Sequence, residues 1–478
     1  MQLAIIVQLS IAMLATEFAG LLPIDAWVGV SIALTGPLAA LLMGMLLAHR
    51  AHRGMNRFDR RGVERMFTFN ARAPWLATMC MAVAAMSALP LGLDNALFDG
   101  ASAVFLMACA LTATLATYFN ASGVERRLRE AAIVRQLDSR VPLQSIPTRA
   151  AYVLAQARAG LLPMLAPLLV PLLLSQIARV LAQQYYPDYV DEAQLCGAIL
   201  GALLLLSLVS LLVPRLLGLH RLAPGELRSD LESLARDAGV GVREIWVWPT
   251  DGLVANAAVM GMLPGLRCVM LSDALLECMP RDEVRAVMAH ELGHVARKHL
   301  PWMIVVVLAC WTLAGFVATP IAEWSFNRLA IDMDEVAREQ LLQGAVVVRD
   351  LGVLVMGLCA FGFASRRFER QADSYAVQLL SSRVGSDQAA PAAVDAMVGA
   401  LGSVALLNHV AVSRGSWRHG SIAWRQEYLR NLQGRAHGGV TQGTFAIGGL
   451  ANDSLITCIR WGALAVIIAG WAMGLRLL

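Results

Sequence analysis

Long apolar runs constrain this chain more than any other feature. Nine stretches of about 20 residues carry few charges, and that length lets an α-helix cross the hydrocarbon core of a bilayer. Charged residues make up 15% of the chain, whereas soluble proteins carry about a quarter. The pattern predicts a mainly α, polytopic helical membrane protein with about nine spans. The predicted spans are residues 3–22, 27–48, 74–93, 101–119, 160–182, 194–217, 302–320, 344–364 and 456–477.

The charges between these runs predict the orientation. Residues 49–73 and residues 120–159 hold seven Arg each. The connections without any Arg or Lys are 23–26, 94–100 and 183–193. Because Arg-rich connections face the cytoplasm, we expect a multi-pass membrane protein with its soluble segment on the cytoplasmic side. The net charge of +4, concentrated at membrane flanks, argues against nucleic-acid binding.

Two segments admit an alternative interpretation. A cleaved signal peptide is the alternative for residues 1–22, although the basic residues that begin such peptides are missing. Residues 120–159 form a basic amphipathic stretch. This stretch is either a helix at the cytoplasmic surface or a solvated loop.

Residues 290–294 read His-Glu-Leu-Gly-His, an HExxH motif inside the helix-like stretch Asp282–Lys298. Residues four apart share one helix face, so both imidazoles can bind one metal ion. Glu291 then faces the open coordination position, where a base can take a proton from water. His299 lies five residues past the second His and is expected to face away from the metal. The motif predicts a zinc hydrolase, and a chance occurrence is the alternative.

A third protein ligand is needed to hold zinc while one position stays open for water. Glu369 and Asp373 lie one turn apart in a helix expected from Ser365 to Leu380. One of them can bind the metal while the other supports an imidazole. The alternative is an exposed helix face with an acidic pair among arginines. The eight cysteines show no Cys-x-x-Cys pairing, so no cysteine zinc site is expected.

The stretch before the HExxH motif has the composition of a soluble segment. A helix is expected from Pro224 to about Asp237. Three runs of β-type residues follow at 242–248, 255–260 and 267–271, separated by glycine and proline. We expect these runs to form a small antiparallel β-sheet that leads into the HExxH helix.

The order of these motifs resembles the integral-membrane zinc peptidases typified by bacterial HtpX and the type 1 CAAX prenyl protease. Those proteins share an HExxH helix, two membrane spans and a helix with Glu-x-x-x-Asp. Here 75 residues separate His294 from Glu369 (369 − 294), and two apolar spans fill the gap. The sequence Glu-Arg-Gln-Ala-Asp at 369–373 matches the later motif. The resemblance covers roughly residues 220–430, whereas residues 1–217 match only in being polytopic.

The resemblance implies a gluzincin-type catalytic domain with one Zn²⁺ per chain. It makes Glu369 the third metal ligand beside His290 and His294. Asp373 becomes the carboxylate that supports a ligand imidazole, and Glu291 becomes the general base.

Three further site residues follow from the same resemblance. His419 and Arg425 match a family pair six residues apart and would stabilise the oxyanion on the attacked carbonyl. Gly420 stands where the family usually has proline, and the alternative is a surface His and Arg in a basic segment. Asn256 resembles a substrate-contacting position beside an edge strand that could bind an extended peptide.

The resemblance implies a zinc metalloendopeptidase of a bacterial-type inner membrane that cleaves membrane or membrane-associated proteins at the cytoplasmic face. Its partners would be polypeptide substrates and the lipid bilayer. Protein quality control is favoured, and processing of CAAX prenyl proteins is the alternative because both kinds of enzyme share the motifs. A non-catalytic membrane scaffold stabilised by zinc is a third interpretation, although structural zinc sites normally fill all four positions. The motifs predict neither the oligomeric state nor the substrate.

These features divide the chain into six segments. They are an N-terminal membrane module of about six spans (1–217), a cytoplasmic catalytic segment with the sheet and the HExxH helix (218–300), two membrane spans (301–364), a catalytic segment with the Glu-x-x-x-Asp helix (365–430), a Gly-rich linker (431–453) and a C-terminal span (454–478).

Overall fold

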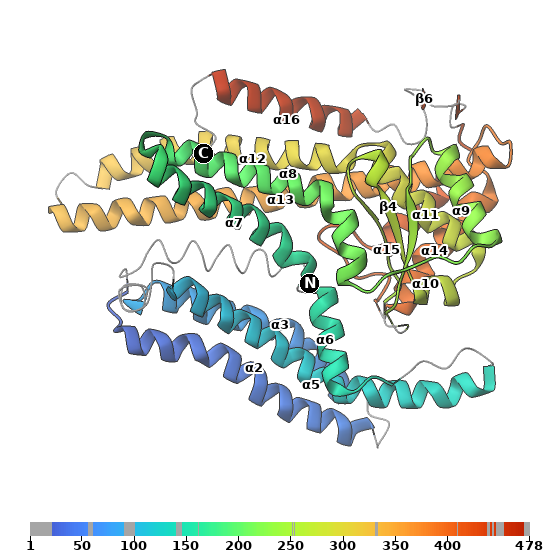
Figure 1. Cartoon of the computed structure of the whole chain (residues 1–478), viewed down its shortest axis with the longest axis horizontal. Helices are drawn as coiled ribbons and strands as arrows, with labels where there is room; N and C mark the ends of the chain where they lie inside the picture. Colours follow the sequence, from blue (N-terminus) through green and yellow to red (C-terminus); the bar gives the residue numbers. More distant parts are fainter. Residues whose placement is uncertain are drawn as a thin grey trace. The chain divides into compact units, whose positions relative to one another are not determined.

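The computed structural model divides the chain into two compact units, Met1–Leu205 and Leu206–Leu478. Helices dominate both units (Figure 1). The described residues are 22–55, 61–89, 101–139, 146–160, 162–250, 252, 254–329, 333–408, 410–436, 440–441, 444–445 and 454–472. Nearly all of the predicted span 3–22 lies outside them.

The first unit is built from helices that approach one another through small residues. Its elements are α2 (Ala26–Met55), α3 (Arg61–Ala85), α5 (Ala101–Ser139), α6 (Arg149–Gly160), α7 (Leu162–Tyr185), η1 (Pro187–Tyr189) and α8 (Val190–Leu216), the last of which continues into the second unit. A Cβ on Gly36 would lie 2.4 Å from the Cα of Ala77. The side-chain nitrogen of Asn120 donates to the carbonyl of Ala40 at 3.0 Å. Such contacts join α2 closely to α3 and α5.

Most of the basic segment at 120–159 that the structure describes is helical, and residues 146–148 are not. Its first half continues α5 without a break, and its second half contains α6. Arg129 of α5 is buried, with its Nε 3.7 Å from a carboxylate oxygen of Glu125 one turn earlier. The segment therefore forms parts of two helices, and within its described residues the loop alternative is limited to residues 146–148.

The prediction of nine spans is not confirmed. Among the described residues, the helical stretches long and apolar enough to cross a membrane are Ala26–Met55, Phe105–Glu130 and His299–Val317, and the pair Glu192–Leu205 and Ser207–Leu216, bent by 59°, would make a fourth. The predicted runs 160–182 and 456–477 overlap α7 (Leu162–Tyr185) and α16 (Ser454–Ala472), but two other runs depart from this pattern. The predicted run 74–93 passes the end of α3 at Ala85, and the run 344–364 includes Arg349 and Asp350.

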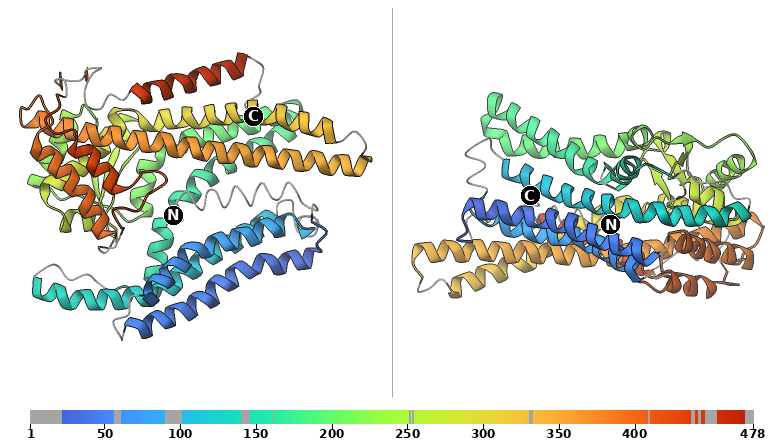
Figure 2. Two further views of the ribbon diagram at one scale, coloured as in Figure 1. Left: turned by 180° about the vertical axis from the view of Figure 1, so that it is seen from behind. Right: turned by 90° about the horizontal axis from the view of Figure 1, so that it is seen from below.

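Three helices run alongside one another in the second unit (Figures 1 and 2). They are α12 (His299–Leu329), α13 (Glu335–Arg383) and α16 (Ser454–Ala472). α12 packs against both of the others. α13 is one continuous helix of 49 residues, so the predicted span 344–364 and the predicted helix 365–380 form a single element. It connects the apolar part of this unit directly to Glu369.

The second unit also contains a four-stranded sheet that is mixed, where the sequence predicted an antiparallel one. Its strands are β1 (His220–Arg221), β2 (Glu244–Trp248), β3 (Ala257–Met260) and β4 (Cys268–Ser272), in the order β1-β2-β4-β3. β3 and β4 form an antiparallel hairpin, but β4 runs parallel to β2. The prediction was wrong because strand patterns do not specify neighbours. The chain after β2 first forms the edge strand β3, and β4 then returns between them.

Helices around this sheet build the main apolar core. They are α9 (Glu226–Asp237), α10 (Asp273–Cys278), α11 (Arg281–Ala296), α14 (Pro391–Leu407) and α15 (Ile422–Arg430). α11 packs against α9, α13, α14 and β3. Its residues Val284, Met288 and Leu292 recur every four positions and join Ile245 and Leu271 of the sheet in one buried cluster. This buried stripe fixes the rotation of α11, and therefore the direction in which its two histidines face.

The predicted Gly-rich linker contains a short hairpin where the structure describes it. β5 (Val440–Thr441) pairs antiparallel with β6 (Thr444–Phe445).

Gly293, within the HExxH motif, allows α11 and α13 to approach closely. A Cβ there would lie 3.1 Å from Cδ1 of Tyr375 and 3.2 Å from the backbone Cα of Ala372. We expect Gly293→Ala to cost about 1–3 kcal/mol of stability, because overpacking exceeds the gain in helix propensity. Thermal unfolding in detergent measures this loss. Gly402→Ala on α14 is the control, since its nearest neighbour is the flexible end of Gln426 at 3.4 Å. Equal losses in both variants would contradict this packing argument.

Candidate metal centre

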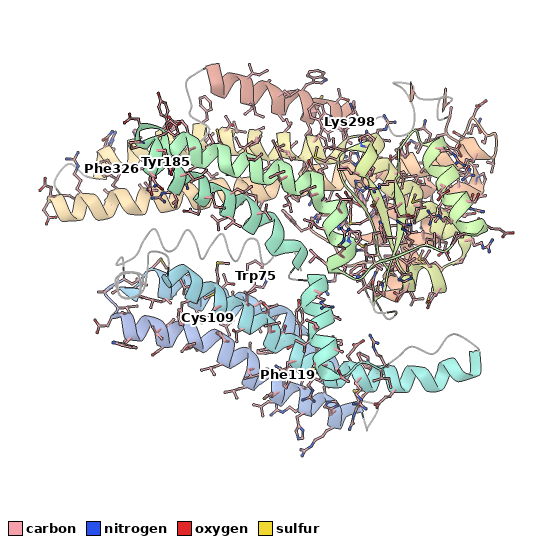
Figure 3. All side chains as sticks on the ribbon, viewed as in Figure 1. Trp75, Cys109, Phe119, Tyr185, Lys298 and Phe326 are labelled. Carbon is pink, nitrogen blue, oxygen red and sulfur yellow. The ribbon has the colours of Figure 1, made fainter. Side chains whose placement is uncertain are left out.

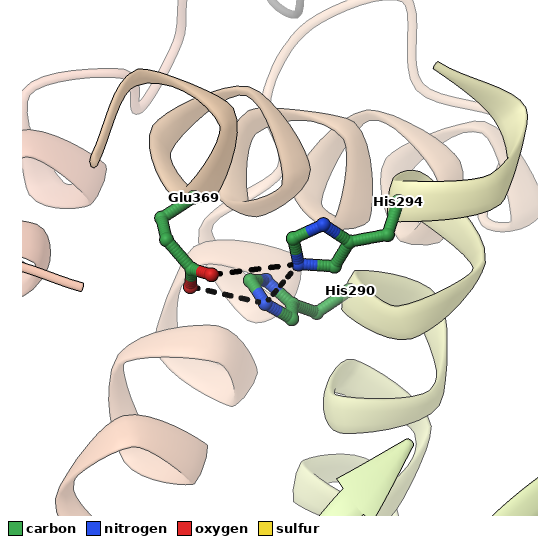
Figure 4. A group of neighbouring side chains, drawn as sticks. All are labelled: His290, His294 and Glu369. Atoms are coloured by element: carbon green, nitrogen blue, oxygen red, sulfur yellow. Dashed lines mark hydrogen bonds and ion pairs between the residues drawn. The ribbon is translucent and has the colours of Figure 1, made fainter. Parts of the chain in front are cut away.

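Two helices bring His290, His294 and Glu369 together (Figure 4). α11 places the two histidines one turn apart, with their Nε2 atoms 3.2 Å from each other. Oε2 of Glu369, from α13, lies 3.5 Å from Nε2 of His290, and Oε1 lies 3.7 Å from Nε2 of His294. One ligand atom from each side chain can be chosen so that all lie within 4.8 Å of one another. The three predicted ligands therefore converge on one point.

The donor set fits a zinc ion. Two imidazole nitrogens and one carboxylate oxygen are ligands that zinc prefers in catalytic sites, where three protein ligands leave a position for water or substrate. His290 and Glu369 are 8% and 5% exposed, so a cation held between these side chains would be largely shielded from solvent and would depend on them for its ligands.

Asp373 and Arg425 lie behind the ligands. Oδ1 of Asp373, which is fully buried, is 2.9 Å from Nδ1 of His290. The guanidinium of Arg425 donates two hydrogen bonds to Asp373, at 2.8 and 2.6 Å, and Nη1 lies 3.2 Å from Oε2 of Glu369. Arg425 therefore places one positive charge against both acidic side chains. Its guanidinium is occupied by these carboxylates.

His419 reaches the site from a loop. Its Nδ1 is 2.9 Å from Oε1 of Glu369, and its side chain is 46% exposed. Gly420 follows in the left-handed region with φ of +75°. Its backbone exchanges two hydrogen bonds with Ser416, both at 2.9 Å, and this closes the loop. Proline cannot adopt a positive φ, so glycine at 420 gives this chain a turn that a His-Pro sequence could not form.

Glu291 stands beside the ligands with an altered pKa. Burial raises the pKa of its carboxyl to about 7, although the charge of His290 and hydrogen bonding from the Val259 backbone on β3 oppose this effect. A group that titrates near neutral pH can both accept and release a proton there. The arrangement suits a general base.

The two histidines differ in their affinity for protons. Burial alone would lower the pKa of His290, but its contacts with Asp373 and Glu369 outweigh burial and raise the pKa to about 10. Burial dominates at His294 and lowers its pKa to about 4. A metal ion must therefore displace a proton from His290 and finds His294 neutral.

The pKa values of the acidic groups shift downward. Burial alone would raise the pKa of Asp373, but Arg425 and His290 lower it. Glu369 follows the same pattern, with contacts to His290, His419 and Arg425 lowering its pKa well below the usual range. Both carboxylates are therefore ionised at neutral pH, as a cation site requires.

Asn256 lies immediately before the edge strand β3. Its side-chain oxygen accepts a hydrogen bond from the backbone of Ala257 at 2.9 Å. Its own backbone nitrogen donates to the hydroxyl of Ser272 at 3.0 Å. These contacts fix the beginning of β3 against β4.

His299 contradicts the expectation that it faces away from the site. Its Nδ1 lies 2.8 Å from Nδ1 of His294. α11 ends at Ala296, and Lys298 adopts a positive φ of 55° before α12 begins. This turn, at the labelled Lys298 in Figure 3, breaks the helix and brings His299 back to His294. The sequence signalled no such turn, because left-handed lysine is uncommon.

Residues 222–430 match the sequence model of Peptidase family M48. This segment belongs to that family. The peptidase segment contains His290, His294, Glu369, Asp373 and Arg425.

Relatives of the peptidase segment carry two different names. The chain is 30% identical over 166 residues to the CAAX prenyl protease 1 homolog of Arabidopsis thaliana, covering 33% of this chain and 38% of that protein. It is 31% identical over 175 residues to Protease HtpX of Pseudomonas putida strain GB-1, covering 37% and 54%. The chain thus spans between two fifths and about half of these relatives' lengths. The crystal structure of S. mikatae Ste24p aligns with a TM-score of 0.45 and 17% identity, over 85% of this chain and 100% of that one.

Proposed function

We propose that this protein is a zinc-dependent endopeptidase with one Zn²⁺ per chain, held by His290, His294 and Glu369. The observation that carries the proposal is the convergence of these three side chains within 4.8 Å, beside a glutamate whose pKa is about 7. The match of residues 222–430 to a peptidase family supports it.

The chain's own residues divide the chemistry among them. When bound, zinc supplies a Lewis acid that lowers the pKa of a water molecule and polarises a carbonyl. Glu291 takes a proton from the attacking water and passes it to the leaving amine. His419, half-exposed beside Glu369, donates a hydrogen bond to the developing oxyanion. We assign Arg425 to holding Glu369 and Asp373, because its guanidinium is already bound to both.

The sheet offers a place for the peptide substrate. β3 is the last strand in the order β1-β2-β4-β3 and packs against α11, which carries Glu291. An extended peptide can add to such an edge through backbone hydrogen bonds. Val259 of β3 hydrogen-bonds to Glu291, so a strand added here lies next to the base. Asn256, which opens β3, is positioned at one end of this peptide.

We place the active site near a membrane surface. Leu38, Leu42 and Leu46 of α2 are 54%, 59% and 57% exposed on one helix face, as expected of side chains in contact with lipid. In the second unit, α11 is followed at once by the candidate span His299–Val317. The Arg-rich connections support an inner-membrane protein with this site on the cytoplasmic side. Membrane and membrane-associated proteins are then its substrates, and quality control is its role.

A substrate comparison tests this role. The detergent-solubilised protein is expected to cleave an unfolded protein and to lose that activity in a zinc chelator, with recovery when zinc is added back. Reactions with Glu291→Gln are the control for contaminating peptidases. Exclusive cleavage of a farnesylated CAAX peptide would favour prenyl-protein processing, the role suggested by one relative's name. Zinc bound without cleavage of either substrate would favour a scaffold and overturn the proposal.

A further inference from the structure

Behind His294 lies a chain of buried polar contacts that parallels the one behind His290. Nδ1 of His294 is 2.8 Å from Nδ1 of His299, and Nε2 of His299 is 2.9 Å from the side-chain oxygen of Gln371. His299 and Gln371 are 4% and 5% exposed. These residues come from the start of α12 and the C-terminal part of α13, so they are held by two different helices.

The C-terminal helix α16 completes this array. Nη2 of Arg460 donates to the carbonyl of Arg297 at 2.8 Å and to the side-chain oxygen of Gln371 at 3.4 Å. The guanidinium also lies over the rings of Trp302 and Phe368, at 5.2 and 5.6 Å from their centres. Arg460 therefore holds the amide of Gln371 with its oxygen towards His299.

The hydrogen bonds of this array can all run in one direction, with His294 donating to His299 and His299 donating to Gln371. A histidine that binds metal through Nε2 in its neutral form carries its proton on Nδ1. That N–H of His294 requires an acceptor, and the facing atom is Nδ1 of His299. His299 must then carry its own proton on Nε2, where Gln371 presents an oxygen acceptor. Arg460 can only donate hydrogen bonds, so it also favours the orientation in which Gln371 presents its side-chain oxygen here.

The plane of the His299 ring is fixed as well. It stacks on Phe368 with ring centres 4.6 Å apart and an angle of 6° between the planes. Its ring is nearly perpendicular to that of His294, at 82°. Stacking and hydrogen bonding together leave the ring little freedom to turn.

We infer that His299 is a positioning residue for the metal centre, which fixes the tautomer and orientation of His294 and is itself fixed by Gln371 and Arg460. Asp373 has the same relation to His290. The inference rests on the proposed function, since it assumes that His294 binds zinc through Nε2. It also ties α16, the last helix among the described residues, to the metal centre.

Zinc affinity tests this inference without relying on activity. His299→Leu is expected to weaken zinc binding about 10–100-fold in a chelator competition, the range for removing a partner of a metal-bound histidine. His299→Asn is expected to recover most of this affinity, because its side-chain oxygen can accept near the position of Nδ1. Gln371→Leu leaves His299 in place but removes the acceptor that fixes its tautomer. Its zinc affinity is expected to lie between those of the wild type and His299→Leu.

A loss of zinc affinity caused by destabilisation of α12 must be distinguished from one caused by the missing contact to His294. Val306→Ala is the control, because Val306 is buried in the apolar cluster that joins α12, α13 and α16 but lies outside the polar array. It is expected to lower the unfolding temperature and leave zinc affinity within about twofold. If His299→Leu and Gln371→Leu both bind zinc as the wild type does, the inference is wrong. Absence of zinc from the wild type would instead overturn the proposed function.

Discussion

Glu291→Gln is expected to lower peptide-bond hydrolysis about 10²–10⁴-fold, the usual contribution of a general base, while the purified protein still carries one zinc ion. Glutamine keeps the shape of the side chain but cannot accept a proton. The metal ligands in our account are other residues, so their geometry is unchanged. Initial rates on an unfolded protein, measured together with zinc content by mass spectrometry, give both quantities on one sample.

The substitution also separates catalysis from folding. Burial raises the pKa of Glu291 to about 7, so above that pH the wild type keeps a partly buried negative charge that glutamine lacks. The metal-free variant is therefore expected to be at least as stable as the metal-free wild type at pH 8. Full activity in a variant that contains zinc would remove Glu291 from the mechanism.

Glu369→Ala is expected to weaken zinc binding by about 10³-fold or more and to abolish hydrolysis. The change removes one of three protein ligands and leaves Arg425 and His419 facing a cavity, since both contact this carboxylate. Chelator competition measures the affinity, and circular dichroism checks that the helices remain.

Asp373→Asn is the matched comparison for Glu369→Ala. Asp373 lies one turn further along α13 and contacts the nitrogen of His290 that faces away from the metal. A smaller loss of zinc affinity, about 10–100-fold, is therefore expected. If the two variants bind zinc equally well and retain activity, the assignment of Glu369 as a ligand is wrong.

The parts of the site that the sequence predicted are those encoded by helical spacing. His290 and His294 are four residues apart, as are Glu369 and Asp373, so each pair shares a face once its helix forms. The resemblance in the order of the motifs then predicted that these two helices contribute to the same metal site. His419 and Arg425 were found in the same way, and the structure places both of them against Glu369.

The parts that the sequence could not predict depend on tertiary contacts. The position of β4 between β2 and β3 follows from how the chain crosses the sheet, which strand patterns do not encode. The turn at Lys298 reverses the direction of His299, and no glycine marks it. The pairing of Arg425 with two carboxylates appears only after α15 packs against α13.

X-ray absorption at the zinc edge, on the full chain in detergent, tests whether His290, His294 and Glu369 hold a zinc ion. About one zinc ion per chain is expected, with two imidazole nitrogens and oxygen ligands, all at about 2.0–2.2 Å. Replacing His294 should remove one imidazole from the spectrum. Sulfur ligands at about 2.3 Å, or a spectrum that is unchanged in the His294 variant, would contradict the site formed by His290, His294 and Glu369.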